Sequence, residues 1–105
     1  MTITIRELND ISEVADFALF DGENDGEVVV AELNGVVAGF CQYDGFTVNF
    51  IESAIEGQGV ARALLDWVEA DTADNVGKEC EGFWAAMGFA YSHRNEYGKP
   101  VWVKE

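Results

Sequence analysis

The sequence predicts an α+β domain, and three observations support this fold class. Between residues 27 and 52, three short segments alternate apolar with polar residues and are separated by Asn-Gly and Asp-Gly pairs. A helical pattern begins near residue 60, and two strand-like segments close the chain. Because 105 residues with 49% hydrophobic content support one hydrophobic core, we expect residues 1–105 to form a single domain.

The N-terminal segment predicts a strand and then a helix. Ile3 and Ile5 alternate with polar residues, which is the period of a half-buried strand. Asp10 and Glu13 have the spacing of a capping box, which marks a helix start. The apolar residues that follow form one helical stripe: Ile11, Val14, Ala15 and Ala18. Residues 21–26 are polar and contain glycine, so we expect a loop there.

The middle of the chain predicts three antiparallel strands, at residues 27–33, 36–43 and 46–52. Asn34-Gly35 and Asp44-Gly45 join them, since both pairs tolerate the positive φ angles of two-residue hairpin turns.

From residue 60 onward, the apolar period becomes helical. One face is shared by Val60, Ala61, Leu64, Leu65 and Val68. We expect this helix to run to about Asn75 and Gly77 to supply the residue that ends it. A second, short helix is expected at residues 83–87, followed by a hairpin of residues 89–95 and 101–104.

The charge balance excludes one class of function. With 20 acidic and 6 basic residues the formal charge is −14, whereas a protein that binds nucleic acid through its phosphates needs a basic surface. We therefore expect no nucleic-acid partner. The acidity leaves four interpretations open: solubility, attraction of a cationic substrate, adaptation to high salt, or mimicry of nucleic acid by an inhibitor.

The chain has no segment that approaches the ~20 apolar residues of a membrane span. Its N-terminus lacks the basic and apolar pattern of a signal peptide, so we expect a cytoplasmic protein without a membrane partner. Cys41 and Cys80 belong to no Cys-x-x-Cys or histidine motif. We therefore expect two reduced, partly buried thiols and no metal site.

The segment most informative about chemistry is Ser53–Leu65, where a strand passes through a glycine-containing turn directly into a helix. Gly57 and Gly59 let the backbone approach a ligand, and the first helical turn presents unpaired N–H groups at the positive end of the helix dipole. These features indicate an anion site that can hold a diphosphate without lysine. Taken alone, Gly-x-Gly is equally typical of a structural turn, and the segment is neither a dinucleotide fingerprint nor a P-loop.

The order of elements and two motifs resemble the GNAT superfamily of acyl-CoA-dependent N-acyltransferases. The central family motif, Gln/Arg-x-x-Gly-x-Gly/Ala, is matched in residues 56–61 at Gly59 and Ala61, and a second signature is echoed by Phe-Trp-Ala-Ala-Met-Gly-Phe at residues 83–89. The resemblance covers residues 27–104. It implies a three-layer fold, here abbreviated, in which a central, mostly antiparallel mixed sheet has helices on both faces.

The resemblance also implies acetyl-CoA (coenzyme A) as the cofactor. In the family, the amides of the turn hold the coenzyme diphosphate, the strand before it pairs with pantetheine, and a main-chain donor polarises the thioester. The residues implied for cofactor binding are Ile51, Glu52, Ser53, Gly57, Gln58, Gly59, Val60, Ala61, Arg62, Phe83 and Trp84. The acceptor amine would attack directly, without a covalent enzyme intermediate.

Three departures from the family pattern bear on activity. Glu56 stands where the motif has Gln or Arg, and a carboxylate is unfavourable beside phosphates. Trp84 stands where many members have the tyrosine that protonates the leaving thiolate, a step that indole cannot perform. Residues 76–82 alone separate the two predicted helices, which leaves little room for the usual fifth strand.

Glu52 is the first candidate for a catalytic general base, because it lies at the end of the strand that lines the implied acyl site. A solvent-facing carboxylate is equally consistent with the alternation of that strand. The weaker acid–base or nucleophile candidates are Asp44, Tyr91, Tyr97, His93 and Cys80, and most have a simpler explanation as turn, packing or surface residues.

The leading hypothesis is therefore an N-acetyltransferase that moves an acetyl group from acetyl-CoA to a cationic small amine or a protein lysine. The alternative is an acyl-CoA-binding regulatory module that docks on a basic protein without turnover. A third hypothesis is an acidic decoy of nucleic acid. A homodimer, in which a second subunit completes a sheet edge, is a further expectation.

Overall fold

The computed structural model describes residues 2–20, 22, 26–55 and 57–105, and this part of the chain contains one seven-stranded sheet. The strands are β1 (Ile3–Glu7), β2 (Glu27–Leu33), β3 (Val36–Asp44), β4 (Thr47–Ser53), β5 (Thr72–Ala73), β6 (Phe89–Arg94) and β7 (Pro100–Lys104). The helices are α1 (Val60–Val68) and α2 (Glu81–Ala86), with single 3-10 turns η1 (Ile11–Glu13) and η2 (Lys78–Cys80).

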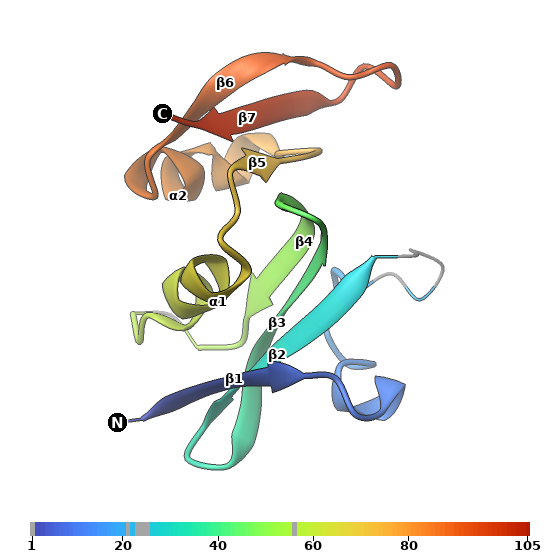
Figure 1. Ribbon diagram of the computed structural model, residues 1–105, viewed down its shortest axis with the longest axis vertical. Coiled ribbons are helices and arrows are strands. Elements are labelled where there is room, and N and C mark those ends of the chain that lie inside the picture. Colours follow the sequence, from blue (N-terminus) through green and yellow to red (C-terminus); the bar gives the residue numbers. More distant parts are fainter. Residues whose placement is uncertain (1, 21, 23–25, 56) are drawn as a thin grey trace.

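The sheet order is β1-β2-β3-β4-β5-β7-β6 (Figure 1). Only the β4–β5 pair is parallel among these neighbours, and the others are antiparallel. The mostly antiparallel mixed sheet predicted from the sequence is therefore confirmed, as is the terminal β6–β7 hairpin.

Two apolar cores lie against the sheet. Both α-helices pack into the larger core, which includes Leu64 of α1 and Trp84 of α2. Val14 belongs to the smaller core, which residues 8–20 cover. Because neighbouring residues of a strand point to opposite faces, Phe40 joins the smaller core while Cys41 joins the larger one.

Both tight turns of the β2–β3–β4 meander form close to their predicted positions. Asn34 and Gly35 have φ angles of 56° and 80°, as a type I′ turn requires. Asp44 still belongs to β3, so the second turn consists of Gly45 and Phe46, one position later than the predicted pair. Gly45 has a φ of 61° at the first turn position, where a type II′ turn needs glycine.

β4 and β5 separate after a short contact. Only Thr47 and Val48 of β4 pair with β5. Beyond them, β4 stays paired with β3 as far as Ser53, with Asn49 as an extra residue in a β-bulge. The opposite edge of β4, over residues 49–53, therefore has no partner from β5.

The first long helix is shorter than predicted. α1 ends at Val68, where Glu69 takes a left-handed φ of 59°. The predicted continuation to Asn75 is wrong, because the Asp, Thr and Asn residues at 71–75 hydrogen-bond locally and disfavour helix interiors. The expectation of little room for a fifth strand is also wrong, since β5 lies within the predicted helix.

The capping box predicted at Asp10 is confirmed, but the α-helix predicted after it is not. The Ser12 amide donates to Asp10 Oδ1 (3.0 Å), and the Asp10 amide donates to Glu13 Oε1 (3.2 Å). Only the single 3-10 turn η1 follows this cap. Most of the loop predicted at residues 21–26 lies outside the described residues.

After η1, turns closed by hydrogen bonds between residues three apart take the place of the predicted helix. The amides of Val14, Phe17 and Phe20 each bond to a carbonyl three residues earlier. Side chains three positions apart align in this geometry, so these three pack against the sheet. Ala15 and Ala18 of the predicted stripe are exposed instead.

The side chain of Arg6 in β1 binds Glu13 of η1 and Glu32 of β2. The hydrogen bond from Arg6, with weaker contributions from the amides of Asn9 and Asp10, lowers the pKa of Glu13 to about 2. A pKa below the unfolded value of 4.5 means that the ionised carboxylate stabilises the fold above that pH. This stabilisation is lost as the pH falls through the folded pKa.

We expect Glu13→Gln to be less stable than the native protein at neutral pH and to lose less stability on acidification. Urea midpoints measured by tryptophan fluorescence between about pH 5 and pH 2 check this. Glu96→Gln, in the exposed β6–β7 turn, is the charge-matched control and should follow the native profile. Identical pH profiles for Glu13→Gln and the native protein would contradict this role.

Gly39 allows α1 and the end of β4 to approach β3. A Cβ atom at this position would lie 2.7 Å from the Glu52 carbonyl oxygen and 2.8 Å from Val60 Cγ1. We expect Gly39→Ala to lower the free energy of unfolding by about 1–3 kcal/mol, because backbone and a buried side chain must shift. Gly82→Ala in α2, which meets nothing within 4 Å, should keep or raise stability in the same denaturation measurement. Full native stability of Gly39→Ala would refute the argument.

Candidate functional site

The first half of the candidate site is the turn between β4 and α1. Gly57 and Gly59 both have a φ of 77°, a left-handed conformation that glycine adopts without strain. The Ala63 amide donates to the Gly59 carbonyl (3.0 Å), and the N-cap residue Gly59 has no side chain that could bond the next amides. The amides of residues 60–62 therefore have no helical partner and lie at the positive end of the helix dipole.

These amides border a hollow of about 380 Å³ beside α2. Its lining residues are Ser53, Ile55, Gly57, Gly59, Val60, Ala61, Arg62, Phe83 and Met87. The structure thus brings most of the predicted cofactor residues together with α2. Gln58 is exposed and does not line the hollow, and Glu56 lies outside the described residues.

The second half is a cleft of about 320 Å³ where β4 and β5 diverge. Its lining residues are Leu19, Val48, Asn49, Phe50, Ile51, Asp74, Asn75, Val76, Gly77, Glu79, Cys80 and Trp84. Ile51 and Trp84 are predicted cofactor residues that line it. Because the β4 edge at residues 49–53 has no partner from β5, an extended ligand could bond to it as an added strand would.

Glu52, the predicted general base, lies on the opposite face of β4 from Ile51. Glu52 pairs with Phe40 of the smaller core, whereas Ile51 pairs with Cys41 of the larger core. The Leu19 amide donates a hydrogen bond to Glu52 Oε1 (2.8 Å), so this carboxylate holds residue 19 at the cleft. Glu52 itself lines neither the cleft nor the glycine-turn hollow.

α2 contributes to both halves of the site. Phe83 lines the glycine-turn hollow, and Trp84 lines the cleft. Trp84 is 5% exposed and packs edge-on against Phe83 and Phe89, with ring centroids 5.2 and 4.9 Å away. One helical turn earlier, Cys80 also lines the cleft, and burial, followed by the charge of Glu79, raises the pKa of its thiol.

Among the other acid–base candidates, Tyr97 lines a hollow of about 230 Å³ that adjoins the cleft, because Asp74 and Asn75 line both. The remaining candidates line neither the cleft nor the glycine-turn hollow. Tyr91 and Tyr97 are 54% and 79% exposed. His93 Nδ1 shares a hydrogen bond with the Ser92 hydroxyl (2.9 Å), and Asp44 ends β3 beside its turn. Within the described ranges, no three His, Cys, Asp or Glu residues gather as metal ligands would, and no helix is long and apolar enough to cross a bilayer.

Two residues that the sequence patterns did not single out form the wall opposite β4. Asp74 and Asn75 follow β5, and Asp74 Oδ1 accepts hydrogen bonds from the Asn75 amide and the Asn95 side chain, both at 2.9 Å. The Asp-Asn pair could have predicted a turn here, since both residues favour turns. Asn75 indeed has a left-handed φ of 54°. No sequence pattern could have placed Leu19 at the cleft, because only contacts with residues distant in the sequence hold it there.

No protein-family model matches the chain, and no curated protein matches it either. Solved structures do match. A GCN5-related N-acetyltransferase from Rhodopseudomonas palustris has a TM-score of 0.64 and 22% identity over 76% of this chain and 61% of that one. The apo form of YjaB from Escherichia coli has a TM-score of 0.68 and 20% identity, covering 97% of this chain and 95% of that one.

N-acetylglutamate synthase from Neisseria gonorrhoeae, solved with coenzyme A and N-acetyl-glutamate, has a TM-score of 0.72 and 14% identity over 99% of this chain and 35% of that one. The chain thus spans 61% of the Rhodopseudomonas structure and 35% of the Neisseria structure. At these identities the likeness concerns the fold, and the protein has the fold of the GNAT N-acetyltransferases.

We expect the two thiols to differ in reactivity. Burial raises the pKa of Cys41 to about 12, whereas Cys80 is half-buried at the cleft. Because the thiolate is the nucleophile, iodoacetamide should label Cys80 more slowly than an unfolded cysteine and leave Cys41 unmodified, as mass spectrometry would show. Raising the pH should accelerate the labelling, and Cys80→Ser should abolish it until urea exposes Cys41. Rapid labelling of Cys41 in the folded protein would contradict this assignment.

Proposed function

We propose that the protein is an acetyl-CoA-dependent N-acetyltransferase. The observation that carries this proposal is the adjacency, at the end of β4, of two sets of main-chain groups that lack partners among the described residues: the amides that begin α1 and the strand edge along the cleft. Phe83 and Trp84, neighbours in α2, connect the two hollows. The GNAT fold and the coenzyme A bound in the Neisseria synthase support the proposal.

The amides of residues 60–62, together with Arg62, would hold the coenzyme diphosphate, since neutral donors and a helix dipole stabilise an anion. Pantetheine would then follow the free edge of β4 over residues 49–53, with Ile51 beside it. The thioester would lie in the cleft near Trp84. A main-chain amide of β4 would donate to the thioester carbonyl and stabilise the oxyanion that develops there.

In the proposed reaction, the acceptor nitrogen attacks the thioester carbonyl carbon, the carbon–sulfur bond breaks, and the amine gives up a proton. Glu52 is the proposed general base, acting directly or through water from the face of β4 away from α1. Its Oε2 has no hydrogen-bond partner among the residues that the structure describes. Trp84 cannot protonate the leaving thiolate, so water or another acid must supply that proton.

The proposed acceptor is a primary amine that is cationic in solution, either a small molecule or a lysine of a basic protein. Asp74 and Glu79 line the cleft, and none of its described lining residues is Lys or Arg. The chain as a whole carries a formal charge of −14. Both features attract an ammonium group toward the thioester.

Gly59→Ala tests the proposed coenzyme site. A side chain at a φ of 77° costs about 1–2 kcal/mol and displaces the amides that begin α1. We expect the Kd for acetyl-CoA, measured by calorimetry, to rise at least ~10-fold, which corresponds to the loss of about one good anion contact.

Gly98→Ala is the matched control, because Gly98 has a φ of 75° in the β6–β7 turn. This variant should lose about as much folding stability as Gly59→Ala does and should bind acetyl-CoA with the native affinity. No detectable binding of acetyl-CoA by the native protein at millimolar concentration would rule out the proposed function. Equal losses of affinity in both variants would rule out this turn as the phosphate site.

A regulatory acyl-CoA-binding module is the second candidate, and the buried Trp84 at the position of the family tyrosine favours it. Thiol release from acetyl-CoA with a panel of amines and basic peptides separates the two. Turnover that Gly59→Ala abolishes supports the enzyme. Binding of a basic protein without turnover supports the module.

A further inference from the structure

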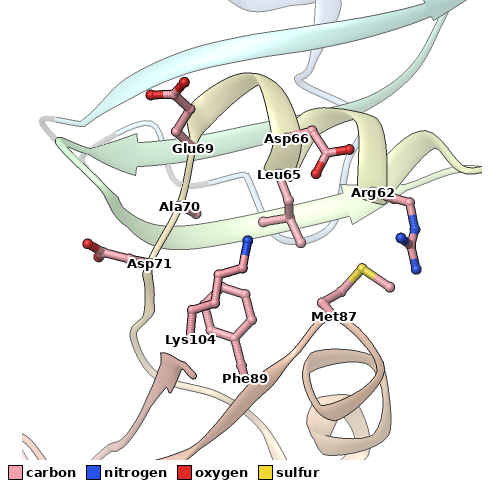
Figure 2. Close-up of a pocket in the computed structure, with 9 residues that line it drawn as sticks. All are labelled: Arg62, Leu65, Asp66, Glu69, Ala70, Asp71, Met87, Phe89 and Lys104. Carbon is pink, nitrogen blue, oxygen red and sulfur yellow. The ribbon is translucent and has the colours of Figure 1, made fainter.

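A second groove, which the proposed reaction does not use, lies between α1 and the ends of β6 and β7. It measures about 370 Å³ and follows α1 from Arg62 to its end, where Glu69 follows the helix. Figure 2 shows Arg62 and Met87 at one end of this groove and Lys104 of β7 in its middle.

The groove contains two cations that have no partner among the residues that the structure describes. The chain has 6 Lys and Arg residues, of which Arg6 is held by two carboxylates and Arg94 donates to a backbone carbonyl. The side chains of Arg62 and Lys104 make no ion pair or hydrogen bond with any described residue, although Asp66, Glu69 and Asp71 line the same groove. Two such cations beside one groove, in so acidic a chain, favour an anionic ligand.

The charged side chains are distributed unevenly along the groove. Figure 2 shows Glu69 and Asp71 at the end away from Arg62, where their carboxylates disfavour an anion. The half between Arg62 and Lys104 contains both cations and one carboxylate, that of Asp66, so it is the half where an anion is less disfavoured. The Lys104 amide donates to the Asp71 carbonyl (2.8 Å), which fixes the end of β7 against the segment after α1.

This groove continues from the glycine-turn hollow, because Arg62 and Met87 line both. If the coenzyme diphosphate lies at the start of α1, the adenosine beyond it leaves the turn beside Arg62. Its 3′-phosphate is a monoester with a charge of about −1.5 to −2, which needs a cationic partner. Leu65, Met87 and Phe89 offer an apolar surface of the kind that receives a flat base.

We infer that this groove binds the adenosine 3′-phosphate end of the coenzyme and that Lys104 recognises the 3′-phosphate. Arg62 lies between this phosphate and the diphosphate and interacts with both. The inference rests on the proposed function and extends it, because it makes the protein selective for coenzyme A over its 3′-dephospho form. The C-terminal strand would then determine which form of the cofactor binds.

Calorimetric titration of coenzyme A and of 3′-dephospho-coenzyme A tests the inference on three proteins: native, Lys104→Gln and Lys78→Gln. Lys78 is an exposed lysine that does not line the groove, so its substitution changes the net charge equally. We expect the native protein to prefer coenzyme A by ~10-fold, as for one charge-assisted contact. Lys104→Gln should lose this preference and keep its affinity for the dephospho form, whereas Lys78→Gln should keep the preference.

The outcomes separate the inference from the function on which it rests. A native protein that binds both ligands equally, or a Lys104→Gln variant that keeps the preference or loses affinity for both ligands alike, overturns the inference and leaves the coenzyme site intact. A native protein that binds neither ligand overturns the proposed function and the inference together. Thermal melts of each variant show whether the fold is retained.

Discussion

The candidate site depends on one constraint: β4 pairs with β5 over two residues and then diverges from it. A strand paired on both edges has no main-chain group left for a ligand. The Asp74 amide makes the last bond to β4, at the Val48 carbonyl (2.9 Å), and Asn75 then turns the chain away. The bulge at Asn49 adds local twist at the same level. The separation thus creates both the cleft and the free strand edge that runs along it.

The sequence predicted correctly those elements that depend on residues close to one another in the chain. Asn34-Gly35 forms its turn because both residues accept a positive φ, and the capping box at Asp10 forms because its partners are close in sequence. Two of the wrong predictions concern how far a helix continues. Glu69 ends α1 in a conformation that non-glycine residues seldom adopt, because the chain must enter the sheet as β5 between β4 and β7. A capping motif predicts where a helix begins. Its length depends on tertiary packing, which the motif does not report.

The same distinction applies to the site. The glycine turn and the start of α1 are contiguous in sequence, so a motif could indicate them together. The cleft combines β4, the segment after β5, α2 and Leu19, which no sequence pattern relates. Glu52 could be placed at the end of β4, but its bond to Leu19 depends on how residues 8–20 cover the sheet. The position of Lys104 in the groove beside α1 could not be predicted either, because it depends on the pairing of β7 with β5 and β6.

An anionic coenzyme and a chain of charge −14 are compatible because the relevant forces act over different distances. The net charge acts through solvent and is screened beyond ~8 Å at physiological ionic strength. In the proposed site, the helix amides and Arg62 would act in contact with a phosphate, and neutral amides would not cancel the acidic field outside. The glycine turn and Glu52 lie on different sides of β4. In the proposed arrangement, β4 would separate the region that holds the diphosphate from the region that attracts the amine, and the thioester would lie where the two meet.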